Sequence, residues 1–165
     1  MRTIMVYFNN LLQRCLPETK FFGLKRKCWR LAGAEIGDNV RICSSAKILG
    51  AGELVIGSNT WIGADVFIST SASVKIGGNC DIAPRVYIGD GTHKITPDKD
   101  RIADVEISEP IIIGNGCWLC ANSMILPGVN IGEKCVIAAG AVVSKSCGNG
   151  ILLAGVPAEI KKKFF

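Results

Sequence analysis

The stretch IGGNCDIAPRVYIGDGTH, residues 76–93, decides the fold. It consists of three six-residue units, which begin at Ile76, Ile82 and Ile88. In each unit the aliphatic residue is followed by Gly or Ala, then by turn-forming residues and a slim side chain. A six-residue period with one lead aliphatic residue per unit is typical of a solenoid, in which stacked coils bury one another.

The same spacing continues on both sides of this stretch. Further units begin at Ile36, Ile42, Ile48, Ile56, Ile62 and Ile68 before it, and at Ile113, Leu119, Ile125, Ile131, Ile137 and Val143 after it. Each coil contains three units, because the first unit of a coil recurs after 20 residues early in the chain and after 18 residues later. The sequence therefore predicts an all-β solenoid over residues 34–150.

The rhythm breaks once, at residues 94–110, which are predicted to form an inserted loop. Ile88 and Ile113 are 25 residues apart, and the only histidine of the chain, His93, stands directly before the loop. Long loops in compact folds are commonly functional, so His93 is the first candidate for catalysis. The apolar residues of the loop (Ile95, Ile102, Val105 and Ile107) predict that part of it packs on another surface.

The two ends lack the six-residue period. Residues 1–33 show helical spacing, and two interpretations remain open: a helical cap over the open end of the solenoid, or a contact with a membrane surface. The second interpretation uses Phe21, Phe22 and Trp29 beside the basic run 25–27. Residues 151–165 are predicted to form a C-terminal tail with a short helix from Pro157.

Composition excludes several classes of protein. The net charge of +5 comes mainly from lysines and arginines near the two ends, without interleaved aromatic residues, so a nucleic-acid partner is not expected. No export signal or membrane-spanning run is evident, which favours the cytoplasm and reduced thiols. Of the eight cysteines, Cys80, Cys117, Cys135 and Cys147 occupy the small-residue places of their units, and Cys43 and Cys120 occupy second places, so most are expected to be core thiols. Cys117 and Cys120 form a lone C-x-x-C, and a single histidine cannot build a three-histidine zinc site, so no metal is expected.

The tandem units, the lone histidine before a long loop and the closing AGVPA (residues 154–158) resemble the hexapeptide-repeat acyltransferases. Within them the chain is most similar to the maltose, galactoside, xenobiotic and serine O-acetyltransferases and to polysaccharide-modifying enzymes. The resemblance covers roughly residues 34–163. It implies a left-handed parallel β-helix, a homotrimer with active sites between subunits, and acetyl-CoA as donor.

Site residues follow from this resemblance by position. His93 matches the catalytic histidine of the family. The acetyl-CoA site is expected at Ala121, Asn122, Ala139, Gly140, Ser144, Lys145, Pro157, Lys161 and Lys162. Trp118, Asp81 and Asp90 are candidate substrate or loop contacts. Glu159 stands where the family often has a basic residue, and Gly63 and Ser71 stand where sugar-acetylating members often have an Asn and an acidic residue.

Transfer of an acetyl group from a thioester to a hydroxyl requires few catalytic groups. A base must take the proton of the acceptor hydroxyl while its oxygen attacks the thioester, and a neutral imidazole suits this task. The hypothesis is that His93 is the base, oriented by Asp81 or Asp90, with a backbone N–H near Gly91 or from the neighbouring coil as oxyanion donor.

We expect a hydroxyl of a sugar or polysaccharide precursor as acceptor, in the cytoplasm or at the inner face of the membrane. N-acetylation of an amino-sugar nucleotide, acetylation of serine and a catalytically silent scaffold remain as alternatives.

Overall fold

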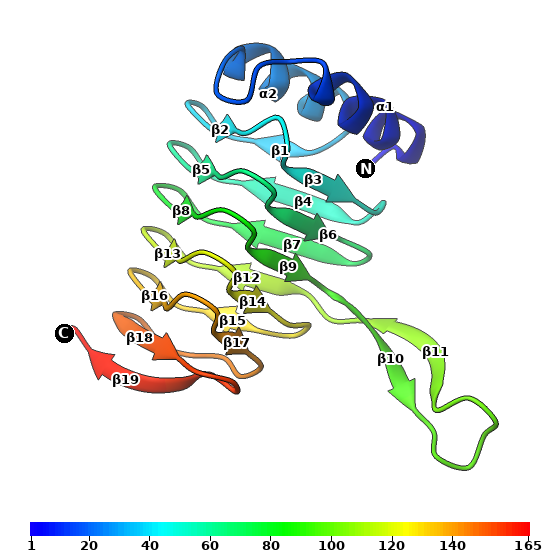
Figure 1. The fold of residues 1–165 in the computed structure, drawn as a ribbon, viewed down its shortest axis with the longest axis vertical. Helices are drawn as coiled ribbons and strands as arrows, with labels where there is room; N and C mark the ends of the chain where they lie inside the picture. The colour runs from blue at the N-terminus through cyan, green and yellow to red at the C-terminus, as the bar shows by residue number, and fades with distance from the viewer.

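The computed structural model describes residues 1–165 as a column of stacked coils with two helices at one end (Figure 1). A two-stranded ribbon projects sideways from the middle of the column, and the C-terminus lies at the end opposite the helices. Each regular coil passes through three short strands, so the column has three faces. The predicted solenoid is confirmed.

Three sheets form these faces. Face A contains β1 (Glu35–Ile36), β4 (Glu53–Ile56), β7 (Ser73–Ile76), β12 (Ile111–Ile113) and β15 (Asn130–Ile131). Face B contains β2 (Arg41–Ile42), β5 (Trp61–Ile62), β8 (Asp81–Ile82), β13 (Trp118–Leu119), β16 (Val136–Ile137), β18 (Ile151–Ala154) and β19 (Glu159–Lys163). Face C contains β3 (Lys47–Leu49), β6 (Phe67–Ser69), β9 (Tyr87–Gly89), β14 (Met124–Ile125) and β17 (Val142–Val143).

The lead aliphatic residues of the units form one buried column behind each face. On face A the parallel register runs through Ile36, Ile56, Ile76, Ile113 and Ile131, and each of these side chains is at most 5% exposed. Equivalent columns begin at Ile42 behind face B and at Ile48 behind face C. Each side chain covers the one below it, so hydrophobic burial between neighbouring coils stabilises the stack.

The predicted C-terminal helix is wrong. Ile151 and Leu153 are buried while Leu152 is partly exposed, so this segment continues face B as β18 with the period of a strand. After a turn at residues 155–158 the chain reverses and β19 pairs antiparallel with β18. A basic run after Pro157 suggested a helix, but the unpaired edge of β18 offered hydrogen bonds that the sequence pattern did not show.

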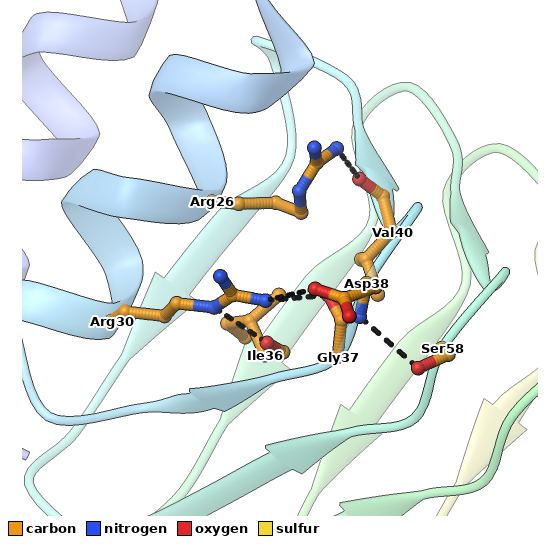
Figure 2. Close-up of polar contacts among 7 residues, drawn as sticks. All are labelled: Arg26, Arg30, Ile36, Gly37, Asp38, Val40 and Ser58. Atoms are coloured by element: carbon orange, nitrogen blue, oxygen red, sulfur yellow. Dashed lines mark hydrogen bonds and ion pairs between the residues drawn. The ribbon is translucent and has the colours of Figure 1, made fainter.

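The N-terminal cap is present as helices α1 (Thr3–Arg14) and α2 (Phe22–Leu31), which lie across the first coil (Figure 1). Figure 2 shows how α2 is attached: Arg26 donates from Nη1 to the carbonyl oxygen of Val40 at 3.0 Å. Arg30 donates from Nε to Ile36 O at 2.7 Å, and from Nη2 to Gly37 O and to the carboxylate of Asp38. Cationic side chains thus satisfy backbone carbonyls at the open end of the solenoid.

Lys25 makes a similar attachment from a fully buried position. Its Nζ lies 2.9 Å from Glu18 O, 3.1 Å from Ile42 O and 3.4 Å from Pro17 O. Burial lowers the pKa of the Lys25 ammonium from its ordinary value, and the neighbouring Cys43 and Glu18 oppose this shift. A buried ammonium is tolerated here because three carbonyl oxygens replace its water.

We expect Lys25→Met to lower the free energy of unfolding by about 2–3 kcal/mol, because three buried carbonyl oxygens lose a charged donor. Urea unfolding would measure this loss. Lys27→Met is the matched control, since Lys27 is exposed on the same helix and should change stability by less than about 0.5 kcal/mol. Equal effects of the two substitutions would contradict the structural role of Lys25.

The inserted loop is an ordered ribbon of β10 (Gly91–Ile95) and β11 (Ala103–Ser108), which pair antiparallel. It leaves the column where face C meets face A, and we call this corner the CA edge. The expectation that the loop packs on another surface is not met within one subunit, because its apolar side chains are exposed, from 39% for Ile107 to 72% for Ile95.

No helix of the chain is both long enough and apolar enough to cross a membrane. The eight cysteines are all free thiols, and four of them (Cys43, Cys80, Cys117 and Cys135) are buried in the column as the unit positions predicted. Cys117 and Cys120 belong to successive turns of the same coil and form no disulfide.

Candidate active site

His93 lies on β10 close to the point where the ribbon leaves the column, and its side chain is exposed. Its Nδ1 lies 3.1 Å from the carbonyl oxygen of Asp104 on β11. A carbonyl only accepts, so in the neutral ring Nδ1 carries the proton and donates it. This tautomer leaves the lone pair of Nε2 available to take a proton from a hydroxyl.

Asp104 is itself held in place by the end of the ribbon. Its Oδ2 accepts hydrogen bonds from Lys99 Nζ at 2.7 Å and from Thr96 Oγ1 at 3.1 Å. The group that orients the His93 ring is thus a backbone carbonyl, which the sequence analysis missed. Residue type carries no signal for such a contact, because every residue has a carbonyl group.

Asp90, one of the two carboxylates predicted to orient His93, is occupied elsewhere. Its side chain is fully buried and accepts three backbone N–H groups from the corner of the preceding coil. The donors are Ser71 N to Oδ1 at 2.7 Å, and Ala72 N and Ser73 N to Oδ2 at 2.8 Å each. The carbonyl oxygen of Asp90 also accepts Glu109 N at 2.8 Å, which closes the root of the ribbon. Asp90 therefore positions the ribbon and does not contact the imidazole.

Asp81 and Trp118 lie side by side on face B, where β8 and β13 pair in register. Both side chains are exposed. Face B is the face that does not border the CA edge, so within one subunit neither side chain shares a site with His93. Asp81 does not orient the histidine in this arrangement.

Four of the predicted acetyl-CoA residues stack at the corner where face B meets face C, which we call the BC edge. Ala121 and Asn122 form this corner in one coil, and Ala139 and Gly140 form it in the next. Gly140 N donates to Ala121 O at 3.0 Å, and Asn122 Oδ1 accepts Arg85 Nε at 2.8 Å. Asn122 and Gly140 both have positive φ, of 59° and 69°, which suits Asn and Gly in tight corners.

The other predicted acetyl-CoA residues lie near the last coil. Ser144 and Lys145 follow β17 at the CA edge, and together with Pro157 and Glu159 they line a cavity of about 310 Å³. Glu159 is the residue of this cavity that departs from the family pattern, because the family often has a basic residue there.

Glu159 neutralises one of the three candidate lysines. Lys161 Nζ lies 3.0 Å from Glu159 Oε2, and this bond lowers the pKa of the Glu159 carboxyl. Lys162 lies over the ring of Phe164, with Nζ 5.5 Å from the centroid, and neither Lys162 nor Lys145 has a carboxylate within 4.0 Å. Lys145 and Lys162 therefore form no ion pair, although the charge of Lys145 also helps to lower the pKa of the Glu159 carboxyl across the shared cavity.

The departures at Gly63 and Ser71 also have structural reasons. A Cβ added to Gly63 would lie 2.7 Å from the carbonyl oxygen of Ile82, so an Asn does not fit this corner without a backbone shift. Ser71 contributes its N–H to Asp90. No group of three or more His, Cys, Asp or Glu side chains gathers closely enough to hold a metal ion.

Two family models match the chain. "Bacterial transferase hexapeptide (six repeats)" matches residues 110–145, and "Hexapeptide repeat of succinyl-transferase" matches residues 53–91. These two segments lie on either side of the ribbon, which neither family model includes in full.

Named relatives agree with this family. The putative colanic acid biosynthesis acetyltransferase WcaF of Escherichia coli is 35% identical over 131 residues, which are 79% of this chain and 70% of WcaF. The galactoside O-acetyltransferase of E. coli is 31% identical over 127 residues, 77% of this chain and 62% of that enzyme. The chain belongs to the hexapeptide-repeat acetyltransferases, and the alternative of a silent scaffold is not supported.

A solved structure shows the same fold. The hexapeptide-repeat acetyltransferase of Vibrio cholerae, crystallised with acetyl coenzyme A, superimposes with a TM-score of 0.77 at 22% identity, over 99% of this chain and 87% of that one.

Proposed function

We propose that this protein transfers the acetyl group of acetyl-CoA to a hydroxyl group of a sugar or polysaccharide precursor. The observation that carries the proposal is the His93 tautomer, since Asp104 O fixes the proton on Nδ1 and leaves Nε2 as a base. The names of WcaF and galactoside O-acetyltransferase support a sugar-type acceptor. The crystal structure with acetyl coenzyme A supports the donor.

The reaction balances with one titrating side chain. His93 Nε2 takes the proton of the acceptor hydroxyl while the oxygen attacks the thioester carbonyl carbon, and a tetrahedral oxyanion forms. The oxyanion collapses, the C–S bond breaks, and the thiolate leaves with the proton that the imidazolium returns. A backbone N–H near Gly91 or from the neighbouring coil remains our proposed oxyanion donor. The products are an acetyl ester and CoA with a free thiol.

We further propose that the enzyme is a homotrimer whose active site lies between subunits. Within one subunit the candidate residues occupy two different corners: Asn122 and Gly140 lie at the BC edge, whereas His93 and Lys145 lie at the CA edge. A complete site needs both sets, so the BC edge of one subunit must meet the CA edge of a neighbour. The exposed apolar residues of the ribbon support such a contact.

Release of the CoA thiol, measured with acetyl-CoA and a panel of acceptors, tests the activity. Sugar and oligosaccharide hydroxyls should release thiol at least about tenfold faster than serine or an amino-sugar nucleotide, a margin that one lost polar contact supplies. Faster release with an amino-sugar nucleotide would favour N-acetylation instead. If none of the acceptors in the panel causes release of the thiol, the proposal is contradicted.

Lys145→Ala is expected to raise KM for acetyl-CoA about tenfold and to leave kcat nearly unchanged, because a charged contact to the phosphates binds ground state and transition state alike. Steady-state kinetics with varied acetyl-CoA would measure both constants. Lys163→Ala serves as the control, since it removes a charge from β19 outside the proposed site. An unchanged KM for Lys145→Ala would remove this residue from the donor site.

A further inference from the structure

The helix α1 has a mixed inner face, where Val6 is buried beside Asn9 and Gln13, and a largely apolar outer face. Asn9 and Gln13 are buried, whereas Ile4, Phe8 and Leu11 are 83%, 56% and 65% exposed. The period of 3.6 residues places these two groups on opposite faces of the helix. A helix that packs on a core normally has polar side chains on its outer face.

Two of the inward polar side chains, Asn9 and Asn10, have partners, whereas the buried side-chain amide of Gln13 has none. Asn10 donates to Ile48 O at 2.6 Å and accepts Ile48 N at 3.2 Å, so it satisfies both backbone groups of a residue on the terminal strand β3. Asn9 donates to Cys28 O at 2.7 Å and ties α1 to α2. These contacts need polar side chains on the inner face. They give no reason for the apolar outer face, which covers nothing within the subunit.

The outer surface of α2 also exposes apolar side chains and adds charge. Leu24 and Leu31 are exposed there, with the exposed Lys27 between them at helical spacing. Residues 1–33 contain seven lysines and arginines and one acidic residue, a net charge of +6, whereas residues 34–165 contain 12 basic and 13 acidic residues, a net charge of −1. The whole positive excess of the chain therefore lies in the cap. Lys25, Arg26 and Arg30 bond to carbonyl groups at the end of the solenoid, so the cations left for the outer surface are Arg2, Arg14, Lys20 and Lys27.

We propose that the outer faces of α1 and α2 dock this protein on an anionic phospholipid surface. Exposed apolar side chains beside exposed lysines are what an interfacial helix needs, because the apolar groups enter the acyl boundary and the cations meet the headgroups. Of the residues that the sequence suggested, Lys27 and Phe21 are exposed, whereas three others are not available to a membrane. Trp29 and Lys25 are fully buried, and Phe22 packs against Trp61 with ring centroids 6.0 Å apart.

Vesicle flotation of the full chain tests this inference without any assay of activity. The protein should float with vesicles of phosphatidylcholine mixed with phosphatidylglycerol and should stay behind with phosphatidylcholine alone. Ile4→Gln/Phe8→Gln/Leu11→Gln should lower the partition coefficient about tenfold or more. Lys20→Gln/Lys27→Gln should lower it about thirtyfold at low salt, and Lys134→Gln/Lys163→Gln, a matched pair elsewhere on the chain, should have little effect.

Light scattering after size exclusion distinguishes a lipid surface from a second copy of the chain. If the triple glutamine variant loses mass and vesicle binding is the same for all variants, the face is a protein interface and the proposal is overturned. Equal flotation with both kinds of vesicle would also overturn it, since the anionic preference would be absent. Circular dichroism of each variant should match the wild type, because all the altered side chains are exposed.

Discussion

His93→Ala is expected to lower kcat by about a hundredfold to ten-thousandfold, the range that one general base contributes. The ring is exposed and its one hydrogen bond is to Asp104 O, so its removal should leave the fold intact. The loss should appear in kcat, while KM for acetyl-CoA should change little. Thiol release under saturating donor and acceptor measures this directly.

The control for this prediction is a change on the same ribbon that leaves the imidazole in place. Lys94→Ala removes the neighbouring exposed side chain on β10 and should keep kcat within about twofold of wild type. Binding of acetyl-CoA to His93→Ala, measured by calorimetry, should equal that of the wild type. Turnover of His93→Ala within threefold or so of wild type would show that the base lies elsewhere.

Asp90→Ala is expected to be the most damaging single change for stability. It leaves three backbone N–H groups without their carboxylate, at a corner where the donor distances are 2.7–2.8 Å. We expect a loss of about 3–4 kcal/mol, and for a chain of this size a midpoint of thermal unfolding about 10 °C lower. Asp90→Asn should recover part of this loss, because its amide oxygen can take the place of Oδ2 opposite Ala72 N and Ser73 N, while its NH₂ group faces Ser71 N alone.

Asp81→Ala is the matched control for Asp90. Asp81 is an exposed carboxylate on face B, and its removal should change the free energy of unfolding by less than about 0.5 kcal/mol. A smaller loss for Asp90→Ala than for Asp81→Ala would mean that the buried carboxylate does not hold the corner. Because the root of the ribbon carries His93, Asp90→Ala should also lower kcat, and Asp81→Ala tests whether a carboxylate on face B affects catalysis.

Sequence alone predicted the repeated part of the fold well, for a physical reason. Each unit has the same short-range pattern, so the spacing of Ile36, Ile56 and Ile76 is enough to predict that they form one buried column. The structure confirms this column. The features that were predicted wrongly or missed depend on contacts between segments that are distant in the sequence. The C-terminal helix was wrong because β18 has a free edge, and Asp104 was missed because it acts through its main chain.

The orientation of the N-terminal helices was also not predictable from the sequence pattern. Helical spacing correctly indicated α1, but the pattern could not reveal which face points inward, because Asn9 bonds to Cys28 O on α2 and Asn10 bonds to Ile48 on β3, and both partners are distant in the sequence. Trp29 and Lys25 looked suited to a membrane and are instead fully buried. Lone aromatic and basic residues acquire their roles only from the surface on which the helix lies.

Asn10 and Ile48 determine how far the column can grow. A stack of identical coils has no intrinsic length, since the edge of one coil is a template for the next, whether that coil comes from the same chain or from another. By occupying both backbone groups of Ile48, Asn10 removes two of the bonds through which a second molecule would join end to end. The helices α1 and α2 thus cap the end of the solenoid. This cap disfavours end-to-end association of several molecules into a filament.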